Sequence, residues 1–244
     1  MFRSTLIALS LCVLAGPAAS RARAQLVFGT PAGSTTSGGS VLANASFTLS
    51  NGRVLVALSN LLGNPTADSQ QISAVLFSVS GATATGSLAS TNQGQISTIS
   101  AGGSYTAGVS DPLTRWEATR TGSTVELTTL TGGAPNRLII GPDDKGNNDP
   151  SLGGLYSNAN PSITNNHNPS VLGTATFDIT IAGVTSSSTV SNVVFQFGTA
   201  AGSNLVNGTA LSVVPEPSSL LLGTVVAALG GVGLFRRQRR RKAS

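Results

Sequence analysis

The sequence predicts an all-β protein whose central part, residues 41–214, folds as an antiparallel β-sandwich of jelly-roll or immunoglobulin-like type. Short runs rich in Val, Thr, Ser and Ile recur along this part, with turn-forming residues between them. Apolar and polar residues alternate within several runs, which is the period of a strand with one buried face. No apolar repeat of three to four residues is sustained between the two ends of the chain, so we do not expect helices to form the core.

The first expected element is a β-hairpin centred on Asn51 and Gly52. Phe47 and Leu49 alternate with polar residues before this pair, and the strand-like run 53–59 follows it. Asn-Gly favours a type I′ turn because both residues tolerate a positive φ. The preceding segment, residues 25–40, is rich in Gly, Ser, Thr and Pro, and we expect either a flexible N-terminal arm or a first edge strand there.

The remaining strands are expected at intervals along the chain. Residues 73–80 are apolar on both faces and predict a central strand. Residues 174–182 alternate cleanly, so one face of that strand should lie on the core. A second hairpin is predicted for runs 113–120 and 124–130, and shorter strands for 137–141, 193–197 and 209–214.

The N-terminus has the pattern of a secretory signal peptide over residues 1–24. Arg3 precedes an apolar stretch at residues 6–15, which is too short to span a bilayer. Ala22, Arg23 and Ala24 form a small-x-small cleavage site, so signal peptidase is expected to cut between Ala24 and Gln25 after export by the Sec machinery. A cut after Ser20 is the alternative.

The C-terminal segment, residues 215–244, combines three features in a fixed order. Pro215, Glu216 and Pro217 come first, and the apolar or small residues 220–235 follow. As a helix that stretch spans roughly 24 Å, slightly less than the roughly 30 Å of a bilayer core. A cationic cluster directly after a membrane span stays on the cytoplasmic side. The basic tail, residues 236–242, consists of Arg236, Arg237, Arg239, Arg240, Arg241 and Lys242 around one Gln.

This order resembles the PEP-CTERM sorting signal of Gram-negative bacteria. The resemblance implies recognition by an exosortase, a membrane protease or transpeptidase that removes the tail and releases the domain to the cell surface or extracellular matrix. The inner membrane then holds the chain only transiently, through one transmembrane helix. The alternative is a permanent anchor that happens to follow a Pro-Glu-Pro sequence.

The basic character of the whole chain comes from these two end segments. The net charge is +5, but residues 25–214 hold five Lys and Arg against eight Asp and Glu, a net charge of −3. We therefore do not expect nucleic acid as a partner. The single cysteine, Cys12, lies in the leader, so the exported domain has no disulfide, thiolate nucleophile or thiolate metal site.

Candidate site residues are few. Asp143, Asp144 and Asp149 supply hard oxygen ligands in one polar loop, which predicts either a Ca²⁺ site or a solvated turn. No cofactor other than Ca²⁺ is expected. Trp116, the sole tryptophan, is either a stacking platform for a sugar or a buried strand aromatic. Tyr105 and Tyr156 are further stacking candidates.

Catalysis is not expected. His167 is the single histidine and lies in a loop rich in Asn and Pro, without a Gly-x-Ser-x-Gly nucleophile turn. Glu117 and Glu126 occupy the two arms of the second predicted hairpin, on positions expected to face solvent. Together with the resemblance to the PEP-CTERM signal, which implies the cell surface or matrix as destination, this predicts a non-enzymatic, exopolysaccharide-associated protein. The alternative is a carbohydrate-binding or adhesive module.

Overall fold

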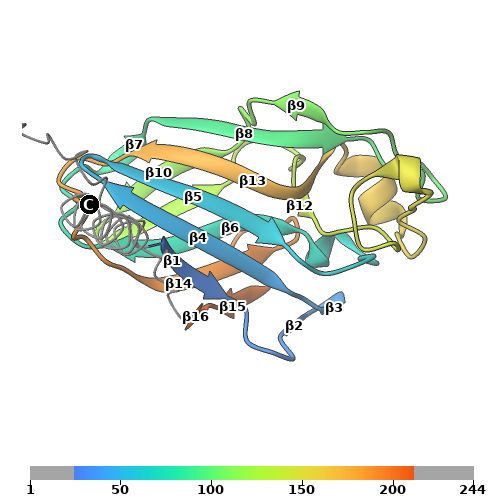
Figure 1. Ribbon diagram of the computed structural model, residues 1–244, viewed down its shortest axis with the longest axis horizontal. Coiled ribbons are helices and arrows are strands. Elements are labelled where there is room, and N and C mark those ends of the chain that lie inside the picture. Colours follow the sequence, from blue (N-terminus) through green and yellow to red (C-terminus); the bar gives the residue numbers. More distant parts are fainter. Residues whose placement is uncertain (1–24, 212–244) are drawn as a thin grey trace, which may run out of the picture. The chain divides into compact units, whose positions relative to one another are not determined.

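The computed structural model describes residues 25–211, which form an all-β domain with three short helical turns (Figure 1). The predicted leader, sorting motif, apolar helix and basic tail all lie outside these residues. Within residues 25–211, no helix has the length and apolar character needed to cross a membrane.

Two runs of hydrogen-bonded strands make up the domain. The first run has the order β16-β1-β4-β5-β13-β8-β9, and the second has the order β7-β10-β11-β6-β14-β15. Every pairing within these runs is antiparallel. The first run consists of β1 (Gln25–Gly29), β4 (Ala43–Ser50), β5 (Arg53–Asn60), β8 (Ser90–Ser97), β9 (Val109–Asp111), β13 (Ser170–Thr180) and β16 (Thr209–Leu211). The second consists of β6 (Ile72–Val79), β7 (Gly86–Leu88), β10 (Glu117–Thr121), β11 (Thr124–Thr128), β14 (Val190–Phe197) and β15 (Leu205–Asn207).

A two-residue strand connects the two runs. β12 (Ile139–Ile140) pairs parallel with β13 and antiparallel with β6, so the sheet as a whole is mixed. The small ribbon of β2 (Thr35–Thr36) and β3 (Gly39–Ser40) stands apart from it. The helical turns are η1 (Asp68–Gln70), η2 (Pro150–Leu152) and η3 (Ser162–Asn166).

The main core receives side chains from both runs. Phe47 of β4 and Phe77 of β6 are fully buried, and their ring centroids lie 4.9 Å apart. Phe177 of β13 contacts Trp116, just before β10, at the same centroid distance of 4.9 Å. Because the alternating positions of β4, β5 and β13 point into this cluster, burial of their apolar residues holds the two runs together.

Local turn chemistry predicted both hairpins. β4 and β5 pair from Ser50 with Arg53 onward, which confirms the hairpin. Gly52 has a positive φ of 74° but Asn51 does not, so the turn is not of the expected type I′. β10 and β11 pair around Gly122 and Ser123. The second hairpin is shorter than expected, because the chain at 113–116 is an irregular loop in which Leu113 has a positive φ.

Residues 25–40 correct one expectation. β1 is paired on both sides, with Val27 opposite Ser46 of β4 and opposite Leu211 of β16. Residues 25–29 are therefore neither a flexible arm nor an edge strand. The edge of the run next to β1 is formed by β16, a strand from the other end of the domain.

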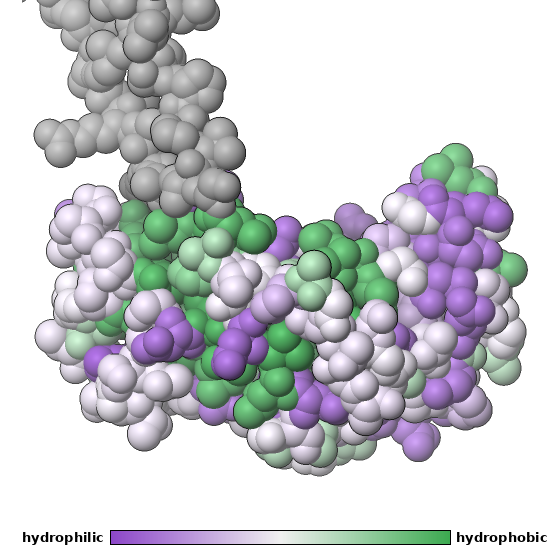
Figure 2. All heavy atoms as spheres, turned by 90° about the horizontal axis from the view of Figure 1, so that it is seen from below, coloured by the Kyte–Doolittle hydropathy of each residue, from purple (hydrophilic) through white to green (hydrophobic). Residues whose placement is uncertain are grey.

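The surface differs along the length of the domain. The end that carries the loops between β12 and β13 is strongly hydrophilic, whereas apolar residues gather near the middle of the same face (Figure 2). Exposed apolar side chains include Leu205 of β15 and Leu211 of β16.

Candidate functional site

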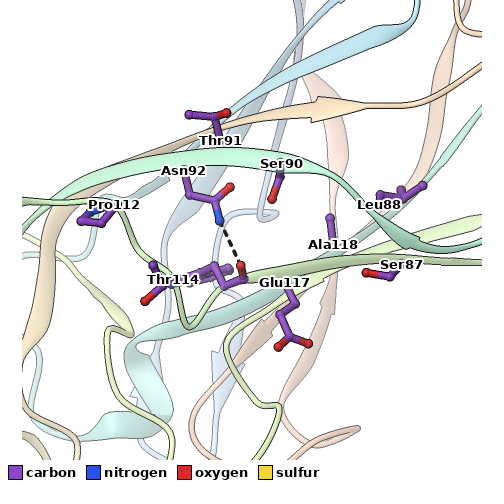
Figure 3. Close-up of a pocket in the computed structure, with 10 residues that line it drawn as sticks. Ser87, Leu88, Ser90, Thr91, Asn92, Pro112, Thr114, Glu117 and Ala118 are labelled. Atoms are coloured by element: carbon purple, nitrogen blue, oxygen red, sulfur yellow. Dashed lines mark hydrogen bonds between the residues drawn. The ribbon is translucent and has the colours of Figure 1, made fainter.

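A pocket of about 430 Å³ opens between β7, β8 and β10, beside the loop at residues 112–116 (Figure 3). Its volume lies within the range of about 300–1,000 Å³ that is usual for small-molecule sites. Its lining includes Leu88, Ser90, Asn92, Trp116 and Ala118.

The pairing of β8 explains why a pocket forms here. β8 pairs with β9 only between Gly94 and Ile96, while residues 90–92 pair with β13 alone. β7 and β10 pair with each other and belong to the other run. The two runs therefore face each other at this place without a hydrogen-bonded ladder between them, which leaves space above the core.

Asn92 is the most unusual residue of the pocket. Its side chain is 7% exposed, and its amide nitrogen donates to the carbonyl oxygens of Trp116 at 2.9 Å and of Leu113 at 3.4 Å. Its Oδ1 atom is buried and has no hydrogen-bond partner among the described residues. An unpaired buried acceptor costs roughly 1–3 kcal/mol. Asn92 thus holds the 113–116 loop through its amide nitrogen, while its amide oxygen is buried without a partner among the described residues.

Alternation along β8 sets the direction of these side chains. Figure 3 shows Ser90 and Asn92 reaching from β8 toward β10, whereas Thr91 between them points to the opposite side. Glu117 points away from Asn92 in the same view. The inner polar groups of the pocket are therefore a hydroxyl and an amide.

Trp116 lies beneath the pocket and is only 2% exposed. Its indole Nε1 donates to the Arg137 carbonyl oxygen at 2.9 Å, and its ring packs against Phe177. Of the two alternatives for Trp116, the structure agrees with a buried aromatic, although the residue lies just before β10 and not within a strand. Tyr105 and Tyr156, which are 8% and 1% exposed, are also too buried to serve as stacking platforms.

An ion pair supports the loop that borders the pocket. Arg137 contacts Asp111 through two hydrogen bonds of 3.1 Å, and Asp111 also accepts from the Leu113 amide at 2.7 Å. The hydrogen bonds from Arg137, assisted by the one from Leu113, hold the pKa of Asp111 below its usual value against the opposing effect of burial. Arg137 thus orders this loop through its side chain and positions Trp116 through its carbonyl.

The three predicted calcium ligands are directed at different partners. Asp143 is 1% exposed and accepts from the Lys145 and Asn147 amides and from the Tyr105 hydroxyl, the last at 2.7 Å. Burial, reinforced by this hydrogen bond, raises the pKa of Tyr105. Asp143 is the buried anchor of its own loop.

Asp144 and Asp149 complete the same loop. Asp144 accepts from the Leu155 amide at 3.0 Å, and Asp149 caps η2 through the Ser151 amide at 3.0 Å. Over residues 25–211, no group of three or more His, Cys, Asp or Glu side chains is placed to hold a metal ion. The contacts of these carboxylates fit the turn alternative, in which the acids organise the loop themselves.

Of the remaining titratable candidates, Glu117 lines the pocket, whereas His167 and Glu126 do not. His167 Nδ1 lies 2.7 Å from the Pro135 carbonyl oxygen, and its Nε2 lies 3.9 Å from Asp68 Oδ2. Glu117 pairs with Thr128 and Glu126 with Thr119, so the two acids share the outer face of the hairpin. Glu117 is exposed, as expected for a solvated position.

No protein-family model, curated protein or solved structure matches this chain.

Sequence reasoning missed Asn92. The segment that contains it is low in apolar residues and shows no strong strand pattern. The available signal was the two-residue spacing of Ser90 and Asn92, continued by Ile96 four residues later, which places these side chains on the inward face of β8.

Proposed function

We propose that this chain is an exported, non-enzymatic protein of the bacterial surface or extracellular matrix, with a β-sandwich domain that associates with exopolysaccharide. An exosortase recognises Pro215, Glu216 and Pro217 and cuts the chain there. The observation that carries the proposal is the order of this tripeptide, the apolar stretch 220–235 and the basic residues 236–242 at one end of the chain. Each part serves a separate step of sorting.

The physical properties of the three parts support these steps. Proline fixes φ and removes an amide donor, so Pro215 and Pro217 favour an extended segment that fits a protease groove. The apolar stretch is short for a permanent anchor and suits a temporary one. The cations after it keep the C-terminus in the cytoplasm while the cut is made.

The strand order supports a sandwich of jelly-roll or immunoglobulin-like kind. The two runs share one core, and neighbouring strands within each run are antiparallel. The described domain reaches Leu211, four positions before Pro215. A cut at the tripeptide thus removes the tail and leaves every strand in place.

Replacement of Pro215, Glu216 and Pro217 by alanine in the full chain tests the proposal. We expect the altered chain to accumulate uncut in the inner membrane, while the wild-type protein reaches the surface or medium without its basic tail. Fractionation and intact-mass measurement report both results. The matched control replaces Ser218 and Ser219, the next two residues, by alanine and should be processed normally. Wild-type surface protein that retains the basic tail would overturn the proposal.

A further inference from the structure

We propose that the pocket between β7, β8 and β10 binds one residue of a neutral saccharide, with a ligand hydroxyl donating to Asn92 Oδ1. The inference deepens the proposed function and rests on it for its biological setting. The choice of ligand class comes from the pocket itself.

The first argument is the unpaired acceptor. Asn92 is 7% exposed, and its amide nitrogen is already committed to the carbonyls of Trp116 and Leu113. The amide orientation is therefore fixed, and Oδ1 is buried without a partner among the described residues. A donor that enters the pocket removes the cost of this buried, unpaired oxygen, so binding is favoured at this point.

The second argument is charge. No Lys or Arg lines the pocket, and Glu117 is its single charged residue. A phosphate, sulfate or carboxylate group would enter the pocket without a cation to pair with. Anionic ligands are disfavoured for this reason, and a neutral ligand is favoured.

The third argument is the mixture of groups around the opening. Ser87, Ser90 and Thr114 add hydroxyls, which both donate and accept, while Leu88 and Ala118 add apolar surface. A sugar presents the same mixture, with hydroxyls at its rim and C–H groups on its faces. Figure 3 shows Ser90 on the same side of β8 as Asn92, so the two can hold neighbouring hydroxyls of one ring.

The test titrates a panel of neutral monosaccharides, with glucuronate as the anionic counterpart, into the full chain. The protein is purified in a zwitterionic detergent that has no sugar headgroup. Saturation-transfer NMR should detect at least one neutral sugar with millimolar affinity, and glucuronate should bind more weakly. Ser90→Leu fills the pocket and should weaken binding more than about tenfold. Gln93→Leu adds the same side chain to the outward face of β8 and should leave binding unchanged.

A second measurement needs no variant and guards against misfolding of Ser90→Leu. The side-chain amide resonances of Asn92 should shift in the wild-type chain as the bound sugar is added. Absence of binding by every neutral sugar, binding that survives in folded Ser90→Leu, or an unmoved Asn92 amide overturns the proposal. Sugar binding is measured on purified protein, whereas sorting is measured on fractionated cells. A failure of the saccharide proposal can therefore be distinguished from a failure of the sorting proposal.

Discussion

At the scale of single residues, the partly buried pair of Asp111 and Arg137 should contribute more to stability than the exposed pair of Arg53 and Asp178. The first pair has side chains 12% and 22% exposed, while the second has 52% and 35%. Asp111→Asn leaves Arg137 without its countercharge and should lower the free energy of unfolding by about 1–3 kcal/mol at pH 7. Asp178→Asn is the matched control and should cost at most about 1 kcal/mol.

The pH dependence of the Asp111→Asn effect has a defined sign. The folded-state pKa of Asp111 is lowered, chiefly by Arg137, so its stabilising effect is complete above the unfolded pKa of about 3.9. The effect is lost as the pH falls through the lower folded-state pKa. Urea denaturation should therefore show a deficit in Asp111→Asn at pH 7 that shrinks at pH 3. Equal deficits at both pH values would contradict this role for the ion pair.

The roles of single residues could be predicted from the sequence only in part. Trp116 had two readings because its burial depends on Phe177 and Arg137, which are distant in the chain. Asp143 was expected to be a metal ligand or a turn residue. It is buried against Tyr105, which is also distant in the chain, and it accepts a hydrogen bond from the Tyr105 hydroxyl. Residue type gave the set of chemical roles, while the choice among them required long-range contacts.

At the scale of elements, position 103 in the loop after β8 should tolerate no side chain. A Cβ atom at Gly103 would lie 2.3 Å from the Tyr156 carbonyl oxygen, whereas one at Gly102 meets nothing within 4 Å. Both glycines have positive φ, 84° and 90°, so alanine carries similar backbone strain at each, about 1–2 kcal/mol. Gly103→Ala should therefore show a clearly lower melting temperature than Gly102→Ala. Equal losses would mean that strain alone, and not the contact with Tyr156, governs this loop.

Elements differ in how well local sequence predicts them. Asn51-Gly52 and Gly122 place two hairpins correctly because turn geometry is decided within a few residues. β12 has only two residues and is defined by its partners β6 and β13, so its pattern was too short to fix its role. The pocket follows from the limited length of β9, which no local pattern reveals.

At the scale of the whole molecule, the first and last strands of the described domain, β1 and β16, are hydrogen-bonded to each other. Composition and alternation predicted the all-β class, but they contain no information on which strands pair across the chain. Val27 of β1 lies opposite Leu211 of β16, so the end that follows the predicted leader pairs with the end that precedes the predicted sorting signal. A signal-peptide cut after Ala24 preserves β1, and a later cut within β1 would damage it.

This pairing makes the start of the mature chain critical for stability. Leu26 and Phe28 pack against the core, and Phe28 meets Phe47 edge-on with ring centroids 5.9 Å apart. A fully buried side chain of this kind contributes about 1.5–3 kcal/mol, so the loss of two partly buried ones should cost at least about 2 kcal/mol. Removal of β1 also takes from β16 the one strand with which it pairs in the described domain.

Urea denaturation of two leaderless chains, one beginning at Gln25 and the other at Thr30, measures this contribution. The shorter chain should unfold at lower urea concentration and with a smaller slope, because less surface is buried in its folded state. A chain that begins at Gln25 and ends at Leu211 is the control, and it should match the longer chain because every strand of the domain is retained. If the chain beginning at Thr30 proved as stable as the one beginning at Gln25, the pairing of β1 with β4 and β16 would not contribute to the stability of the domain.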